Sequence, residues 1–210
     1  MNTTARVRGR RRSLVALLAA GAALAGLRPR GVLAHGGTND EPSRKHLQVR
    51  RPKVDPLPAI PLTTMQGTPR TLDRELANTN PLVVNFVFTT CSTSCSLITA
   101  VLAEVQQKLT AKGRKLQLAS ITIDPANDTP EQLRGYARKF GAGADWQFYT
   151  GRFDDMVAIQ RLFDVYRGSK VSHPPVLMLR RDQKAPWVRI EGFPTPDDVL
   201  SLIETLPKAA

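Results

Sequence analysis

Cysteine is scarce in this sequence, and its scarcity excludes one class of protein. The 210 residues contain two cysteines, at positions 91 and 95, and three histidines. Two cysteines cannot build the framework of several disulfide bonds that holds small secreted domains together. Because the two lie only four positions apart, they indicate local chemistry instead: a redox pair, a metal site, or both.

Acidic residues are absent from positions 1–34, and this asymmetry explains most of the formal net charge of +12. The segment holds seven arginines, so the other positions carry 23 of the 30 basic residues against all 18 acidic ones. Such a mild excess requires no polyanionic partner, and we expect no binding to nucleic acid. The hydrophobic content of 41% is sufficient for a packed core.

The N-terminal hydrophobic run is too short to span a membrane. It covers the 15 residues 13–27, whereas a spanning helix needs about 20. Basic residues precede it at 6–12, and a small-residue cleavage site follows at 32–34, so residues 1–34 have the three-part plan of an export signal. Arg-Arg-Ser-Leu-Val at 11–15 resembles a twin-arginine signal; a general secretory signal and an uncleaved membrane anchor are the alternatives.

Residues 35–58 are rich in proline and charge and contain few apolar residues. Such a stretch cannot bury enough surface to fold alone, so we expect a flexible tether between the signal and one folded domain at residues 59–206. His35 and His46 lie in this tether and are expected to be solvent-exposed. Cleavage after Ala34 would also give His35 a free amine, which together with its imidazole forms a chelate.

Hydrophobic periodicity predicts alternating strands and helices in the domain. Residues 82–88 form a near-continuous apolar run, which predicts a strand buried on both faces. Threonine followed by proline predicts helix starts at 129–130 and 195–196. The full series is a hairpin at 60–71, strands at 82–88, 116–123, 146–149, 176–179 and 187–190, and helices at 97–109, 130–140, 156–166 and from 196 onward.

This order of elements predicts an α/β protein with a thioredoxin-like fold. Early alternation of strand and helix favours a parallel centre, and the late hairpin adds antiparallel strands. We therefore expect a central mixed sheet flanked by helices, with an N-terminal β-hairpin and an inserted strand and helix.

Cys91 and Cys95 follow the buried strand at the start of the next helix. Ligands bind at this end of the strands in open α/β sheets, and the positive end of a helix dipole lowers the pKa of a thiol. A thiolate is both the nucleophile of disulfide exchange and a soft metal ligand. A disulfide that closes so short a loop stabilises little, which favours a reactive pair. The spacing of four is expected to place both sulfurs on one side of the first helical turn.

His173 is the candidate third ligand, because in the predicted fold its loop lies beside the loop of Cys91 and Cys95. Two thiolates and one imidazole suit Cu(I) and can also hold Cu(II), whereas a closed zinc site needs a fourth ligand. Met178 is expected in the core rather than at the metal.

Two carboxylates lie at the end of the strand at 116–123. Asp128 is interpreted as a turn or capping residue. Asp124 either has the same structural role or tunes the site electrostatically.

Three segments of the domain resemble the Sco/SenC family. Residues 88–95 read Phe-Thr-Thr-Cys-Ser-Thr-Ser-Cys and resemble the family motif Phe-Thr-x-Cys-x-x-x-Cys. Residues 123–130 read Ile-Asp-Pro-Ala-Asn-Asp-Thr-Pro and resemble its Asp-Pro-x-x-Asp-Thr-Pro segment. Residues 146–151 read Trp-Gln-Phe-Tyr-Thr-Gly and resemble its Trp-x-x-Leu-Thr-Gly. The segments occur in family order, and the resemblance covers about residues 58–206.

The resemblance implies a periplasmic thioredoxin-fold protein that binds copper through two cysteines and one histidine, which fall on Cys91, Cys95 and His173. It also implies delivery of copper, or of reducing equivalents, to the dinuclear copper centre of cytochrome oxidase, whose apo copper subunit would be the partner. A thioredoxin-like reductant is a second expected partner. Membrane contact is expected only peripherally or through an uncleaved signal.

The chain departs from the family pattern around these ligands. Ser92 and Ser96 stand where the family has proline, and Ser172 stands where it has aspartate before the histidine. Pro174 and Pro175 follow the histidine in place of a hydroxyl residue, and Pro175 resembles the cis-proline of thiol oxidoreductases. These changes concern the surroundings of the ligands and leave the predicted fold unchanged.

Three functions are compatible with these residues. The first is a copper metallochaperone. The second is a thiol–disulfide oxidoreductase that uses the Cys91/Cys95 pair, with copper incidental. The third is a copper-dependent sensor or electron-transfer module that serves another exported cuproenzyme.

Overall fold

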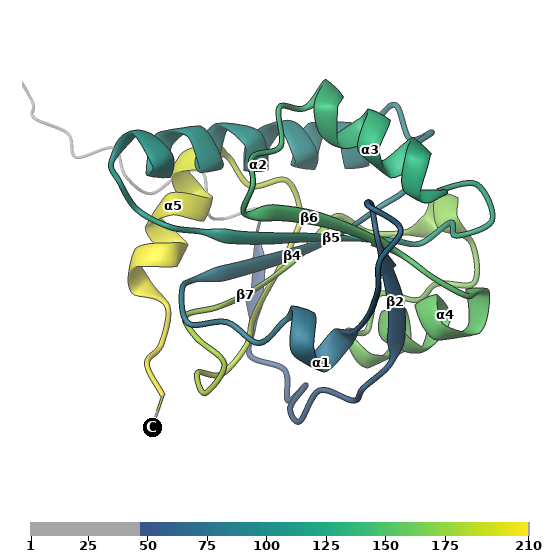
Figure 1. Cartoon of the computed structure of the whole chain (residues 1–210). Helices are drawn as coiled ribbons and strands as arrows, with labels where there is room; N and C mark the ends of the chain where they lie inside the picture. Colours follow the sequence, from purple (N-terminus) through teal and green to yellow (C-terminus); the bar gives the residue numbers. More distant parts are fainter. Residues whose placement is uncertain (1–46, 210) are drawn as a thin grey trace, which may run out of the picture. The chain divides into compact units, whose positions relative to one another are not determined.

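A mixed eight-stranded sheet forms the centre of residues 47–209, the part of the chain that this computed structural model describes. Helices lie on both faces of the sheet (Figure 1), as expected for the predicted α/β, thioredoxin-like fold. The predicted export signal, residues 1–34, and the first part of the predicted tether lie outside the described residues. Among the helices that are described, none has the length and apolar character needed to cross a membrane.

The predicted elements are present with small shifts of their ends. The strands are β1 (Gln48–Arg50), β2 (Pro61–Thr64), β3 (Pro69–Thr71), β4 (Leu82–Val87), β5 (Gln117–Thr122), β6 (Trp146–Thr150), β7 (Val176–Arg180) and β8 (Val188–Glu191). The helices are α1 (Leu72–Glu75), α2 (Ser94–Ala111), α3 (Pro130–Lys139), α4 (Phe153–Leu162), α5 (Pro196–Thr205) and the short 3-10 turn η2 (Lys170–Ser172).

Strand β4 is the central strand of the sheet, whose order is β1-β8-β7-β4-β5-β6-β2-β3. All six of its residues are buried, as the apolar run predicts for a strand covered on both faces. It pairs parallel with β5, with Val87 opposite Thr122, and antiparallel with β7, with Leu82 opposite Arg180. The carboxyl ends of β4 and β5 and the amino end of β7 therefore meet at one edge of the sheet.

The helices divide between the two faces of the sheet. Apolar side chains of α2, α3 and α5 form one core against the first face, and side chains of α1 and α4 form a second core against the other. Figure 1 shows α2 and α3 on one side of the strands and α1 and α4 on the other. The starts of α3 and α5 are capped by Thr129 and Thr195, whose hydroxyls accept backbone N–H groups, as the threonine–proline pairs predict.

Helix α4 differs in extent from the predicted helix at 156–166. It begins three residues earlier, at Phe153, and ends at Leu162. Asp164 adopts a left-handed backbone conformation with φ 53°, which a helix does not continue through. The residues after it lead into η2 and the loop that carries His173.

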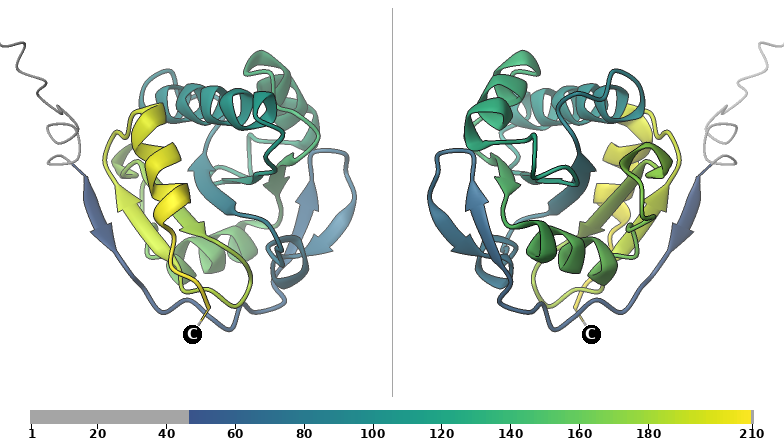
Figure 2. Two further views of the ribbon diagram at one scale, coloured as in Figure 1. Left: turned by 90° about the vertical axis from the view of Figure 1, so that its left-hand side faces the viewer. Right: turned by 90° about the vertical axis from the view of Figure 1, so that its right-hand side faces the viewer.

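Residues 48–58, assigned from the sequence to a flexible tether, belong to the folded domain, and this corrects the predicted boundary at residue 58. Strand β1 pairs antiparallel with β8, with Gln48 opposite Glu191. This pairing satisfies backbone groups of β8 that would otherwise form an open sheet edge. Val54 is buried in the core that includes α1 and α4. Figure 2 shows β1 at the edge of the sheet opposite the hairpin of β2 and β3.

We expect Val54→Ala to lower the free energy of unfolding by about 2 kcal/mol, because two buried methyl groups are lost and a small cavity remains. Val49→Ala is the matched control from β1, since Val49 is 51% exposed; it should change stability by less than about 0.5 kcal/mol. Urea unfolding of both variants checks this, and equal effects would contradict the burial of this segment.

Candidate metal centre

Three segments lie at one edge of the sheet. They are the cysteine loop (residues 88–95), the segment that contains Asp124, and the histidine loop (residues 168–175), which contains His173. The cysteine loop follows β4, Asp124 follows β5, and His173 precedes β7. The pairing of β4 with both neighbours brings these three chain ends together. The structure thus confirms the expectation that the cysteine and histidine loops are neighbours, at the end of the strands where open α/β sheets bind ligands.

Cys91 lies just before α2 rather than in its first turn. The helix begins at Ser94, and the hydroxyl of its N-cap residue, Thr93, makes no capping hydrogen bond. The sulfur of Cys91 takes that role: it accepts the backbone N–H of Cys95 at 3.4 Å. The expectation that both cysteines belong to the first helical turn is corrected for Cys91, which precedes the helix. Its Sγ still lies beside Cys95, because it satisfies a free N–H at the helix start.

The two thiols have opposite acid–base character. Burial raises the pKa of Cys91, but hydrogen bonds from the Cys95 N–H and from Thr93 outweigh it and lower the pKa to about 7. Burial raises the pKa of Cys95 to about 12, and the neighbouring Cys91 contributes to the rise. Both are buried, free thiols in the structure. Cys91 is therefore the natural nucleophile, and Cys95 is ionised only when a bound cation or a reaction removes its proton.

Asp128 fixes the start of the cysteine loop. Its side chain is completely buried and accepts the Thr89 N–H at 3.1 Å, the Thr89 hydroxyl at 2.6 Å and the Thr122 hydroxyl at 2.5 Å. The interpretation as a structural residue holds, although its main partners lie on other segments rather than in its own turn. Asp128 connects the end of β5 to the residue two positions before Cys91.

His173 directly follows η2. Its ring contacts Phe86, with ring centroids 6.1 Å apart, and it shares a small cavity with Cys95 and Ser94. Its Nε2 atom is buried and has no hydrogen-bond partner in the structure. Burial lowers the pKa of His173 to about 4, assisted by the positive charges of Arg167 and Arg189, so the imidazole is neutral at pH 7.

These donors fit a copper ion in type. An orphaned, neutral imidazole nitrogen and two thiols, one of which ionises readily, are the forms that metal ligands require. Among the described residues, however, no three His, Cys, Asp or Glu side chains are grouped closely enough to hold a metal ion. The ligand set of Cys91, Cys95 and His173 therefore stays a prediction, although Cys95 and His173 line the same small cavity.

The other residues singled out from the sequence have structural positions. Met178 is buried within β7, as expected for a core residue. The Ser96 hydroxyl donates to the Cys91 carbonyl at 2.7 Å. The bond before Pro175 is trans, the default for X–Pro bonds, since the one cis bond of the described residues joins Asp55 and Pro56; the comparison with a cis-proline is wrong.

In the metal-free, reduced protein, we expect a limiting amount of iodoacetamide to modify Cys91 before Cys95. The rate at Cys91 should rise with pH and reach half its maximum near pH 7, because the thiolate reacts and its pKa is about 7. Peptide mass spectrometry at each pH measures both sites. Faster modification of Cys95, or a midpoint at the ordinary thiol pKa of 9.0, would contradict this order.

We expect Asp128→Ala to lower the free energy of unfolding by about 3 kcal/mol, because a buried hydroxyl of Thr122 and two partly buried donors of Thr89 lose their acceptor. Asp128→Asn should cost less, since the amide oxygen still accepts hydrogen bonds. Asp145→Ala, at an exposed aspartate, is the control and should change stability by less than about 0.5 kcal/mol. Chemical denaturation tests the series; equal values for Asp128→Ala and Asp145→Ala would argue against the anchoring role.

Comparison with known proteins identifies the family of this chain. The SCO1/SenC family profile matches residues 60–203. The SCO1 protein homolog of Bacillus subtilis is 37% identical over 70 residues, which cover 33% of this chain and 36% of the homolog. The chain thus matches only about a third of the length of that curated relative.

Solved structures share the fold. The crystal structure of copper-bound yeast Sco1 superposes with a TM-score of 0.59 at 24% identity, over 70% of this chain and 84% of the yeast chain. BsSco, described as a member of the Sco family of cytochrome c oxidase assembly proteins with a disulfide switch, superposes with a TM-score of 0.57 at 24% identity, over 69% of this chain and 89% of its own. The family profile, which spans more than half of the residues, establishes that this chain belongs to the SCO1/SenC family.

Proposed function

We propose that the protein is an exported copper metallochaperone that holds copper through Cys91, Cys95 and His173 and delivers it to a cuproenzyme. One observation carries the proposal. At the same edge of the sheet lie the Cys91 thiol, whose pKa is about 7, and the His173 imidazole, which is neutral and has no hydrogen-bond partner at Nε2. Copper is the cargo here, and soft thiolates with an imidazole are a donor set that retains it.

Each ligand has a distinct task in this proposal. Cys91 offers a thiolate at neutral pH, at the positive end of α2. Cys95 gives up its proton as the cation binds, because its pKa is high in the metal-free protein. His173 supplies the nitrogen, which matters more for Cu(II) than for Cu(I), since two thiolates alone hold Cu(I).

Exposed apolar side chains beside the site support a protein partner. Leu97, two residues after Cys95, is 52% exposed, and Val171, two residues before His173, is 82% exposed. Phe193 is also exposed and follows Gly192, whose N–H donates to the Pro175 carbonyl. Exposed apolar groups next to a functional site are typical of interaction surfaces.

The apo copper subunit of cytochrome oxidase is the partner that we propose. Membership of a family whose member BsSco is described as a cytochrome c oxidase assembly protein supports it. Location in the periplasm is part of the same proposal, and its support is the arginine-rich, cleavable signal predicted at residues 1–34.

Copper binding by ligand variants tests the proposal. We expect one Cu(I) per chain in the wild type and none retained by Cys91→Ser or Cys95→Ser under competition with a Cu(I) chelator. His173→Ala should retain Cu(I) but lose more than about 100-fold in Cu(II) affinity, because loss of a residue that only supports a ligand already costs 10–100-fold.

X-ray absorption and competition titrations measure both oxidation states, and His46→Ala is the histidine control. Identical coordination in the wild type and His173→Ala, with no nitrogen ligand lost, would remove His173 from the site. Copper binding would then be assigned to the two thiols, Cys91 and Cys95, alone.

Thiol–disulfide exchange is the second candidate, favoured by the difference in pKa between the two cysteines. The Cys91 thiolate would attack a partner disulfide and form a mixed disulfide, releasing one partner thiolate. Cys95 would then attack Cys91 Sγ, release the second partner sulfur and pass its proton to a partner thiolate. The partner gains two electrons, and the chain ends with a Cys91–Cys95 disulfide. Reductase activity that survives His173→Ala and is lost in both cysteine variants would favour this function over copper delivery.

A further inference from the structure

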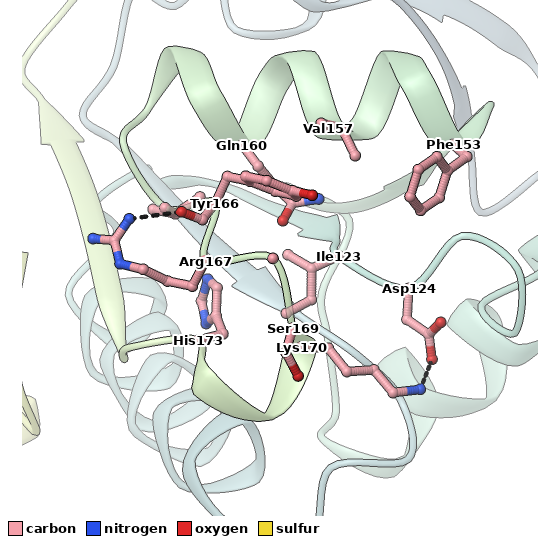
Figure 3. A pocket seen from close by; sticks show the side chains of 12 residues that line it. Ile123, Asp124, Phe153, Val157, Gln160, Tyr166, Arg167, Ser169, Lys170 and His173 are labelled. Atoms are coloured by element: carbon pink, nitrogen blue, oxygen red, sulfur yellow. Dashed lines mark hydrogen bonds and ion pairs between the residues drawn. The ribbon is translucent and has the colours of Figure 1, made fainter.

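The side chain of Lys170 crosses the edge of the sheet at which the site lies. Its Nζ atom lies 2.5 Å from Asp124 Oδ2 and 5.4 Å from the centroid of the Phe88 ring. Figure 3 shows the lysine extended away from His173 toward the Asp124 carboxylate. Lys170, Asp124 and His173 border one cavity of about 170 Å³, and Figure 3 labels all three side chains around it.

Each contact of Lys170 belongs to a different part of the site. Asp124 follows β5, and Phe88 follows β4. The Phe88 carbonyl accepts the backbone N–H of Cys91 at 3.0 Å. Lys170 itself begins η2, the turn that leads into His173, and its carbonyl accepts the His173 N–H at 3.4 Å. One side chain therefore joins the histidine loop to both neighbouring strand ends.

The fixed end of this connection is Asp124. Its carboxylate oxygens both accept the Asn127 side-chain amide at 3.0 Å, its N–H donates to the Thr122 hydroxyl at 2.9 Å, and it is only 9% exposed. The other end of the connection, the histidine loop, is held by fewer side-chain contacts. Within residues 168–175, all of them described, Lys170 makes the only side-chain hydrogen bond or ion pair to another element.

We propose that Lys170 is a positioning residue: its contacts with Asp124 and Phe88 hold the His173 loop beside the cysteines and so set the cost of bringing the imidazole onto copper. This inference rests on the proposed function, because it acts through His173 as a ligand. A loop that is already held in place loses less conformational freedom when its side chain binds. Removing the contacts of Lys170 should weaken the bond between copper and His173 and leave copper binding by the two thiols unaffected.

The first experiment uses the metal-free protein and is independent of copper. Lys170→Met keeps the length of the side chain and removes its charge, and Asp124→Asn removes the charge of its partner. Hydrogen–deuterium exchange of residues 168–174 should be about threefold to fivefold faster in both variants, the size expected for a partly exposed ion pair. Lys184→Met, an exposed lysine in the turn at the opposite end of β7, should leave exchange unchanged. Unchanged exchange in Lys170→Met would overturn the inference.

The second experiment measures copper. Lys170→Met should weaken Cu(II) binding about threefold to fivefold, reduce the nitrogen hyperfine coupling in the electron paramagnetic resonance spectrum, and leave the uptake of one Cu(I) unchanged. Lys170→Arg keeps the positive charge and should restore both Cu(II) properties. When Lys170→Met is added to His173→Ala, the affinity for Cu(II) should fall no further, because the lysine acts through the histidine.

The outcomes separate the two proposals. If His173→Ala weakens Cu(II) binding and Lys170→Met does not, the positioning role is wrong and the proposed function stands. If His173→Ala itself has no effect on Cu(II), the assignment of His173 as a ligand fails, and the Lys170 inference fails with it even where loop exchange is faster.

Discussion

The pairing of β4 with β5 on one side and β7 on the other is the constraint on which the site depends. A parallel neighbour ends at the same edge as β4, and an antiparallel neighbour begins there. The three segments, which follow Val87 and Thr122 and precede Val176, are far apart in the chain and are thereby held together by backbone hydrogen bonds within one sheet. The burial of β4 on both faces stabilises this arrangement, because its apolar side chains pack into the cores on both sides of the sheet.

The start of α2 adds a chemical asymmetry to this geometry. Cys91 Sγ occupies the place of a capping oxygen and receives the N–H of Cys95, which lowers the pKa of Cys91 to about 7. Cys95 lies within the helix and is more deeply desolvated, which raises its pKa to about 12. The same five-residue segment therefore presents one sulfur that ionises near neutral pH and one that stays protonated, an arrangement that suits either metal capture or disulfide exchange.

The site combines a rigid half and a less constrained half. Asp128 binds the cysteine loop to β5 through buried hydrogen bonds, so the thiols start from a defined position. His173 lies on a loop whose side chains contact the rest of the site mainly through Lys170 and the ring of Phe86. The position of the imidazole thus depends on few side-chain contacts, whereas the cysteine loop is held by a buried carboxylate.

Local patterns in the sequence determined the strands, the helix starts at Thr129 and Thr195, and the cysteine pair, because periodicity, capping and spacing depend on residues that are near in the chain. Only the tertiary structure decided that β1 joins the sheet, that Cys91 precedes its helix, and that Lys170 reaches Asp124. The lysine and its partner are 46 positions apart, and a lone lysine in a polar loop carries no local signal of a partner. Such contacts arise from the order in which strands assemble, which is set by the burial of the whole core rather than by any one segment.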